Sequence, residues 1–332
     1  MNWKQLISAK RFGMEEFHEE RQENRSEFQR DYDRLIFSAP FRRLQNKTQV
    51  FPLPGSVFVH NRLTHSLEVA SVGRSLGDDV AKALLERHPE LQDSFLPEIG
   101  SIVSAACLAH DLGNPPFGHS GEKAISTFFS EGKGVRLKEK QPNGEQLSPM
   151  EWEDLTHFEG NANAFRILTH QFEGRRRGGF VLTYSTLASI VKYPFSSSLA
   201  GKKSKFGFFV SEEESYRKIA TELGLIQLSE QPLKYARHPL VYLVEAADDI
   251  CYQMMDIEDA HKLKIITTDE TKELLMAFFS EDRQSRLRST FQIVNDINEQ
   301  IAYLRSSVIG LLVRECTRVF LEHEQEILAG TF

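Results

Sequence analysis

Apolar residues recur every three or four positions over long stretches of this chain, and strict alternation of apolar and polar residues is rare. The first spacing puts apolar side chains on one face of a helix, whereas alternation would indicate strands. The clearest helical patterns cover residues 62–86 and 98–112, and the second ends at a glycine followed by a pair of prolines. The pattern therefore predicts an all-α fold.

The rest of the chain follows the same period with interruptions. The expected elements are a helix over 119–129, a flexible polar insertion up to about residue 149, two shorter helices over 152–172 and 184–192, and a basic loop over 196–209. Pro239 precedes the most apolar helical pattern, which we expect to lie buried at the centre. Residues 268–332 indicate two or three amphipathic helices of a bundle.

These patterns suggest two regions. We expect a core of residues 1–265, which includes an N-terminal extension, and a C-terminal helical region of residues 266–332 packed on that core. The last residues, from Glu326 to Phe332, look like a motif that continues, so we expect the chain to be truncated there.

The composition argues against several classes of protein. The chain has 332 residues with 40 lysines and arginines against 47 aspartates and glutamates, and its net charge of −7 argues against a whole-surface attraction to nucleic acid or anionic lipid. No apolar run approaches the ~20 residues of a membrane-spanning helix, and no secretory leader follows the N-terminal lysines. The three cysteines form no CxxC pair. We therefore expect a cytoplasmic protein that has no membrane partner.

Acidic residues stand inside the most apolar helical pattern. Asp248 and Asp249 have apolar neighbours, and a buried carboxylate is costly unless it is paired or bound to a metal ion. Asp248, Tyr252 and Asp256 follow one another at intervals of four residues. They therefore share a helix face, and we expect them to line a common pocket.

Histidines supply complementary ligands. His110 and Asp111 stand together just before the glycine and proline break, and His65 lies one turn after Arg62. A lone His-Asp pair is weak evidence, because a histidine that caps its own helix gives the same sequence. Two histidines with two aspartates suit Mn, Fe, Zn or a similar divalent ion, and Mg when phosphate oxygens contribute.

Separated motifs of the chain resemble those of a known family. The segments Arg62-Leu63-Thr64-His65-Ser66, Ala109-His110-Asp111-Leu112-Gly113 and Glu245-Ala246-Ala247-Asp248-Asp249 resemble the H…HD…D signature of HD-domain metal phosphohydrolases. Further motifs are similar to those of the bacterial deoxyguanosinetriphosphate triphosphohydrolase (dGTPase-like) family: Phe41-Arg42-Arg43-Leu44-Gln45, Gly113-Asn114-Pro115-Pro116-Phe117-Gly118-His119, Phe158-Glu159-Gly160-Asn161 and Lys192-Tyr193-Pro194. The resemblance runs from about residue 30 to the end of the chain.

The resemblance implies a helical HD fold with additional C-terminal helices. It implies hydrolysis of dGTP or another dNTP to a deoxynucleoside and inorganic triphosphate, with a divalent metal ion, Mg, Mn or a similar transition metal, as cofactor. It also implies a homo-oligomer, often a hexamer, and activation by a dNTP or single-stranded DNA at a remote site.

Carried over position by position, the resemblance implies that the metal ligands are His65, His110, Asp111 and Asp248. Asp249 is not the ligand, because the family's tyrosine follows its ligand by four positions, as Tyr252 follows Asp248. We expect Asp249 to be a salt-bridged helix residue instead.

The family's catalytic histidine and glutamate fall on His119 and Glu122. The nucleoside 5′-oxygen is a poor leaving group, so the reaction needs a general acid. Residues three apart share a helix face, so Glu122 can hold the imidazole of His119 and favour its protonated form. The alternative is a histidine at a helix N-terminus that has no catalytic role.

Other positions are candidates for binding the substrate. Gln49 matches a family position that contacts the sugar 3′-hydroxyl, and Tyr252 is expected to fill the space that a 2′-hydroxyl would need. For Lys202, Lys203 and Lys205, a solvated surface and a phosphate-binding or allosteric role both stay open. The full set of expected substrate contacts is Gln49, Arg62, Lys192, Tyr193, Tyr252 and Asp256, of which the cations would bind phosphate.

Some positions depart from the vertebrate relatives of the family. Phe158 and Asn114 stand where those relatives carry histidines, and Glu159 and Asn161 are candidates for supporting the site. The sequence thus predicts a dNTP triphosphohydrolase. The alternatives are another HD phosphohydrolase, acting on a different nucleotide or a phosphodiester, and a catalytically silent nucleotide-sensing module.

Overall fold

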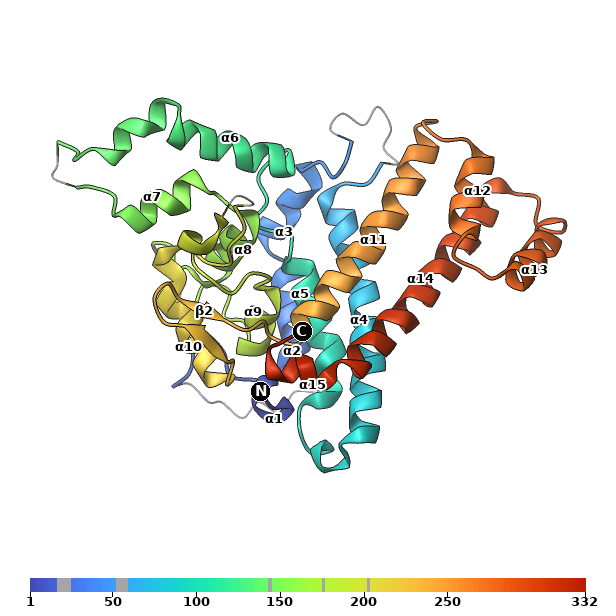
Figure 1. Ribbon diagram of the computed structural model, residues 1–332, viewed down its shortest axis with the longest axis horizontal. Coiled ribbons are helices and arrows are strands. Elements are labelled where there is room, and N and C mark those ends of the chain that lie inside the picture. Colours follow the sequence, from blue (N-terminus) through green and yellow to red (C-terminus); the bar gives the residue numbers. More distant parts are fainter. Residues whose placement is uncertain (17–24, 52–58, 143–144, 175–176, 202–203) are drawn as a thin grey trace.

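The computed structural model describes residues 1–16, 25–51, 59–142, 145–174, 177–201 and 204–332, and within them the fold is built from helices (Figure 1). The helices are α1 (Trp3–Leu6), α2 (Glu27–Ile36), α3 (Ala39–Arg43), α4 (Arg62–Arg87), α5 (Ile99–Ala109), α6 (Gly118–Ser130), α7 (Pro149–Thr156), α8 (Gly160–Thr169), α9 (Tyr184–Ile190), α10 (Glu213–Glu222), α11 (Leu240–Lys262), α12 (Thr268–Met276), α13 (Glu281–Phe291), α14 (Ile297–Glu322) and α15 (Glu324–Ala329). Two short strands, β1 (Gln227–Ser229) and β2 (Lys234–Tyr235), pair antiparallel. The predicted all-α class is confirmed. Within the described ranges, no helix has the length and apolarity that crossing a membrane requires.

The centre of the fold is occupied by α5. All of its residues except Ser101 are buried, and it packs against α2, α4, α9 and α11. One face of α11 is buried, but Tyr252 and Gln253 on this helix are exposed. The apolar residues of the helix after Pro239 are buried, as expected, but the centre is formed by α5, whose small residues let four other helices approach it.

The helices α4 and α5 run antiparallel and approach each other closely. A Cβ atom on Gly77 would lie 2.6 Å from the Cα of Gly100, and one on Gly73 would lie 2.5 Å from the Sγ of Cys107. Contacts this short leave no room for a larger residue without a shift of the helices. Because the two helices are antiparallel, the start of α4 meets the end of α5.

Two helix boundaries differ from the sequence prediction. Helix α5 ends at Ala109 rather than at residue 112, so His110 is its C-cap and Asp111 lies in the turn that follows. The segment 152–172 is divided, because the carboxylate of Glu159 accepts hydrogen bonds from two backbone N–H groups at the start of α8. This N-cap begins a new helix at the next residue.

The two segments predicted as loops contain ordered structure. Residues Lys133–Lys138 of the polar insertion form a 3-10 helix, and in the basic loop Phe206 and Phe208 are fully buried. Lys202 and Lys203 lie outside the described residues.

The C-terminal residues form four helices, α12 to α15, rather than the two or three expected. Helix α14 packs against both α4 and α11. Figure 1 shows α12 and α13 extending away from the core on the side opposite to α6 and α7. A separate apolar cluster, which includes Leu275, Leu287, Leu304 and Val308, joins α12, α13 and α14. The boundary between residues 265 and 266 stays a prediction.

The N-terminal segment is tied to the core through Asp31 on α2. The side chain of Asp31 is fully buried and accepts hydrogen bonds from the N–H and hydroxyl groups of Thr183, at 2.9 and 2.6 Å. It also pairs with the Arg11 guanidinium at 2.7 Å. Because Arg11 also pairs with Glu27, the groups that depend most on Asp31 are the buried N–H and hydroxyl of Thr183.

We expect Asp31→Ala to lower the free energy of unfolding by about 2–5 kcal/mol, because two buried donors of Thr183 lose their acceptor and each unsatisfied group costs about 1–3 kcal/mol. Asp33→Ala is the matched control on the same helix, because Asp33 pairs with Arg25 at the surface and such pairs contribute ~0–1 kcal/mol. Urea unfolding followed by circular dichroism measures both variants. Equal losses in the two would contradict the anchoring role of Asp31.

Candidate active site

One cavity brings the predicted site residues together. It has a volume of about 490 Å³ and is lined by residues from the start of α4, the end of α5, the start of α6 and the middle of α11. Small-molecule sites typically measure about 300–1,000 Å³. The predicted residues in its walls are Gln49, Arg62, His65, His110, Asp111, His119, Glu122, Lys192, Tyr193, Asp248 and Tyr252.

Asp256 is the exception. It lies two turns after Asp248 on α11 and is not part of the cavity wall that the described residues form. Each four-residue step along a helix turns by about 40° and rises by about 6 Å, so Asp256 has left the face that Asp248 occupies. The contact between Asp256 and the substrate therefore stays a prediction.

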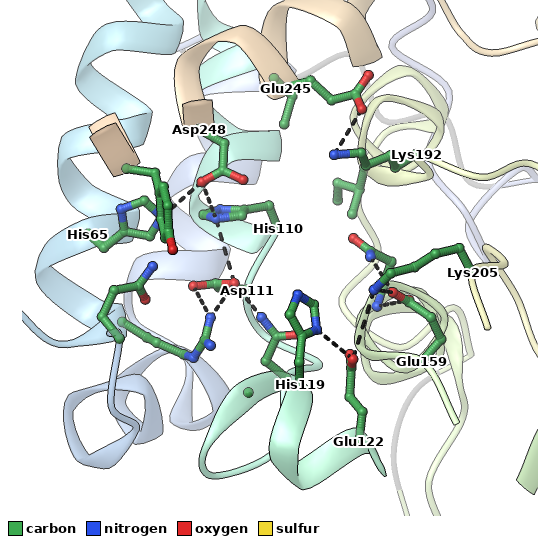
Figure 2. Close-up of a pocket in the computed structure, with 18 of the residues that line it drawn as sticks. His65, His110, Asp111, His119, Glu122, Glu159, Lys192, Lys205, Glu245 and Asp248 are labelled. Carbon is green, nitrogen blue, oxygen red and sulfur yellow. Dashed lines mark hydrogen bonds and ion pairs between the residues drawn. The ribbon is translucent and has the colours of Figure 1, made fainter. Parts of the chain in front are cut away.

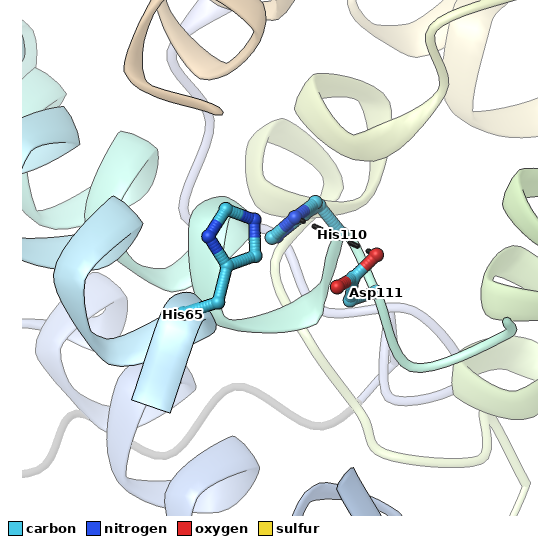
Figure 3. Close-up of side chains that lie close together, drawn as sticks. All are labelled: His65, His110 and Asp111. Carbon is cyan, nitrogen blue, oxygen red and sulfur yellow. Dashed lines mark ion pairs between the residues drawn. The ribbon is translucent and has the colours of Figure 1, made fainter. Parts of the chain in front are cut away.

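His65, His110 and Asp248 meet at one side of the cavity (Figure 2). The Oδ1 atom of Asp248 lies 2.9 Å from Nε2 of His65 and 3.4 Å from Nε2 of His110. The two imidazole rings are nearly perpendicular, with centroids 5.3 Å apart. Figure 3 shows the Asp111 carboxylate on the far side of His110 from His65, with Oδ1 3.7 Å from Nε2 of His110.

His110 is oriented by its own helix. Its Nδ1 atom donates a hydrogen bond to the carbonyl oxygen of Cys107 at 2.6 Å, so the other ring nitrogen faces the cavity side. That Nε2 atom is buried and has no hydrogen-bond partner in the part of the chain that the structure describes. An imidazole whose second nitrogen is fixed by a backbone carbonyl is well suited to bind a metal ion.

Asp111 is oriented by two neighbours. The Nη1 atom of Arg62 lies 2.8 Å from each carboxylate oxygen, and the side-chain amide of Asn114 donates to Oδ1. Arg62 therefore contacts Asp111 while it lines the cavity. Asn114, which stands in place of a histidine of the vertebrate relatives, holds this carboxylate in position.

Opposite charges offset the cost of burying these groups. Burial would lower the pKa of His110, but the carboxylates of Asp111 and Asp248 outweigh it and raise that pKa to about 9. Burial would raise the pKa of both aspartates, yet His110 together with Arg62 holds the pKa of Asp111 below its ordinary value. His110 and His65 likewise keep the pKa of Asp248 well below its ordinary value. The carboxylates therefore remain charged.

The donor set fits a divalent metal ion. Donor atoms of His65, His110 and Asp111 lie within 4.8 Å of one another, and Asp248 approaches both histidines. Imidazole nitrogens combined with carboxylate oxygens suit transition-metal ions. Of the two neighbouring aspartates on α11, only Asp248 is in the described wall of the cavity, whereas Asp249 is not.

His119 and Glu122 form a pair at the start of α6. The Nδ1 atom of His119 lies 2.7 Å from Oε2 of Glu122. The His119 side chain is 84% exposed, whereas that of Glu122 is 11% exposed, so the imidazole projects into the cavity from a fixed carboxylate. Figure 2 shows this pair facing the group around His110 and Asp111. The arrangement allows His119 to exchange a proton with a bound ligand.

Two lysines in the cavity wall are each paired with a glutamate. Lys192 Nζ lies 2.9 Å from Glu245, and Lys205 Nζ lies 2.8 Å from Glu159. Glu245 was not predicted as a site residue, although its place three residues before Asp248 puts it near the same helix face. Lys205, for which two roles were open, lies in the cavity wall.

Gln49 and Tyr252 present polar groups to the same cavity. The Oε1 atom of Gln49 is buried and has no hydrogen-bond partner within the described ranges, so it can accept from a ligand hydroxyl. Tyr252 is 45% exposed. Burial, together with the charge of Asp256, raises the pKa of its hydroxyl, which therefore stays neutral and able to donate.

Comparisons with known proteins agree with this geometry. The family model of the HD domain matches residues 62–228, so the helical fold is that of an HD domain with additional C-terminal helices. HD domains bind divalent metal ions, and His65, His110 and Asp111 form a candidate site for one.

Curated relatives extend the match to the whole chain. The chain is 42% identical to a deoxyguanosinetriphosphate triphosphohydrolase-like protein of Synechocystis sp., in an alignment that covers 100% of this chain and 74% of the relative. It is 43% identical to a protein of the same name from Pseudomonas aeruginosa, over 99% of this chain and 73% of the relative. A deoxyguanosinetriphosphate triphosphohydrolase of Yersinia enterocolitica is 33% identical, over 100% of this chain and 72% of that protein. The chain therefore belongs to the deoxyguanosinetriphosphate triphosphohydrolase (dGTPase-like) family of HD-domain proteins.

Proposed function

We propose that this protein is a dNTP triphosphohydrolase, which converts dGTP or another dNTP to a deoxynucleoside and inorganic triphosphate. The observation that carries the proposal is the histidine and glutamate pair that faces two histidines and two aspartates in one cavity. A silent nucleotide-binding module has no need of an acid at this place. The names of the relatives support the same activity.

The metal ion would be held by His65, His110, Asp111 and Asp248. When bound, an ion such as Mg, Mn or a similar transition metal would supply Lewis-acid stabilisation of the charge on the reacting phosphoryl group. The side chains that hold these ligands then have a defined task. Arg62 keeps both oxygens of Asp111 in one orientation, and the Cys107 carbonyl fixes the ring of His110.

The proton that the leaving group needs would come from His119. Release of intact triphosphate requires water to attack the α-phosphorus while the bond from that phosphorus to the 5′-oxygen breaks, and an alkoxide is a poor leaving group. His119 would donate its proton to the 5′-oxygen as that bond breaks. Glu122 would hold the ring through Nδ1, which leaves Nε2 directed at the substrate.

Contacts with the rest of the substrate follow from the charges and acceptors in the wall. We propose that Arg62, Lys192 and Tyr193 contact phosphate oxygens, since these side chains line the cavity. Gln49 would accept a hydrogen bond from the 3′-hydroxyl through its unpartnered Oε1 atom. Tyr252 would occupy the space beside the sugar and exclude a 2′-hydroxyl.

The first test is the identity of the products. We expect Mn²⁺-loaded protein, incubated with each dNTP and NTP alone and in mixtures, to release deoxynucleoside and inorganic triphosphate in equal amounts, with dNTPs turned over faster than NTPs. Chromatography and ³¹P NMR identify the products. Release of phosphate or pyrophosphate, or hydrolysis only of a phosphodiester, would instead support another HD phosphohydrolase. Binding without turnover would indicate a sensing module.

The metal ligand on α11 can be tested with two neighbouring substitutions. We expect Asp248→Ala to weaken metal binding by at least ~10²-fold, because it removes a charged ligand rather than an outer contact. Asp249→Ala is the matched control and should retain the metal, since Asp249 lies outside the described cavity wall. Elemental analysis after dialysis measures both. Stoichiometric metal in the Asp248 variant would show that the ligand assignment is wrong.

The role of His119 as an acid can be tested separately from metal binding. We expect His119→Ala to bind metal and dNTP nearly normally while single-turnover hydrolysis falls by ~10² to 10⁴, toward the upper end because the leaving group is poor. Glu122→Ala should act in the same direction, and the two losses should not add, because both disable one unit. Normal turnover in His119→Ala, or metal loss as large as in Asp248→Ala, would refute the acid role.

A further inference from the structure

The two carboxylate oxygens of Glu122 have different neighbours. Oε1 accepts a hydrogen bond from the backbone N–H of Gly160 at 2.8 Å, which fixes one end of the carboxylate. Oε2 lies 2.7 Å from Nδ1 of His119 and 3.8 Å from Nζ of Lys205. The imidazole and the ammonium group therefore approach the same oxygen, and only the imidazole is within hydrogen-bond distance of it.

Lys205 is held back from that oxygen by a second carboxylate. Its Nζ atom lies 2.8 Å from Oε1 of Glu159, closer than to Glu122, and Figure 2 shows it between the two glutamates. Burial lowers the pKa of Lys205, but Glu159 outweighs this effect and raises it, so the ammonium stays charged. A charged donor would otherwise form a strong hydrogen bond with the nearer oxygen of Glu122.

Glu159 is a rigid anchor. Its side chain is 1% exposed, and it caps α8 by accepting hydrogen bonds from the backbone N–H groups of Asn161 and Ala162. The side-chain amide of Asn161 donates to Oε1 as well, at 2.8 Å. The backbone therefore fixes the position of the Glu159 carboxylate. Lys205 is held in place by its ion pair with this carboxylate.

We propose that Glu159 is a positioning residue, which anchors Lys205 so that Oε2 of Glu122 stays paired with His119. The value of this arrangement for catalysis rests on the proposed function, whereas the contact itself does not. When Glu159 is neutral, Lys205 turns to Glu122 and His119 loses its partner. The lysine is then the cause of the defect, so removing it as well restores the pair.

The test is a double-mutant cycle between Glu159→Gln and Lys205→Met. Glutamine keeps a capping oxygen for α8 but carries no charge, and methionine fills the volume of the lysine chain without a donor. We expect Glu159→Gln to lower kcat for the dNTP by about tenfold when Lys205 is present, and by less than about twofold in the Lys205→Met background. KM should respond less than kcat, because the defect lies in the acid.

A second readout does not depend on turnover. In protein labelled with ¹⁵N-histidine, we expect the Nδ1 resonance of His119 to shift in Glu159→Gln and to return to its position in Lys205→Met when both changes are combined. Glu212→Gln is the matched control, because Glu212 is also a buried carboxylate, paired with Arg166 at 2.5 Å, but lies outside this cavity wall. It should lower the melting temperature without moving that resonance.

The outcomes separate the two hypotheses. Equal kcat losses with and without Lys205, together with an unmoved Nδ1 resonance, would mean that Glu159 only caps α8, and the proposal would be overturned. If the wild-type protein hydrolyses no dNTP, the proposed function fails, yet the resonance still decides the role of Glu159. If Glu159→Gln does not fold, Glu159→Asp, a capping carboxylate one methylene shorter, should show a smaller shift of the same resonance that Lys205→Met abolishes.

Discussion

Two carboxylates and two imidazoles lie against one another, largely shielded from water, where α4, α5 and α11 meet, and the rest of the site depends on this arrangement. Removing charged groups from water is costly, and only close partners of opposite charge make it tolerable. Asp248 meets both His65 and His110, while Asp111 is held by Arg62. These groups converge because α4 and α5 are antiparallel, so residues 45 positions apart in sequence share one end of a helix pair. A divalent ion would take the place of the positive charge that the protein otherwise supplies.

The two walls of the cavity are joined through a tightly packed turn at the start of α8. A Cβ atom on Gly160 would lie 2.0 Å from Oδ1 of Asn114 and 2.9 Å from Oε1 of Glu122. Asn114 holds Asp111 in one wall of the cavity, and Glu122 holds His119 in the other. The same turn thus sets the position of both groups, which matters because an acid acts only when it lies within hydrogen-bond reach of the leaving oxygen.

The parts of this site that follow a helical period or a compact motif could be predicted from the sequence. The three-residue spacing of His119 and Glu122 predicted that they share a helix face, and the family motifs predicted the cluster of residues around His110. The period did not place Asp256 in the described cavity wall, because a four-residue repeat drifts around the helix by about 40° at each step. The ion pairs of Lys192 with Glu245 and of Lys205 with Glu159 could not be predicted, since they join residues 53 and 46 positions apart whose meeting depends on the packing of whole helices. The end of α5 was also missed, because apolar residues continue past the point where the backbone turns away.

The glycine contact between α4 and α5 acts on the cavity from a distance. His65 lies 12 residues before Gly77, and His110 lies 10 residues after Gly100, so both imidazoles sit roughly 15 to 18 Å from the contact along their helices. At Gly77 and Gly100 the backbones of the two helices approach each other closely. A methyl group added at either glycine would push α4 and α5 apart and change the distance between the two imidazoles. The distance between the two imidazoles, and with it the size of any ion that they would hold, therefore depends in part on glycines outside the described cavity wall.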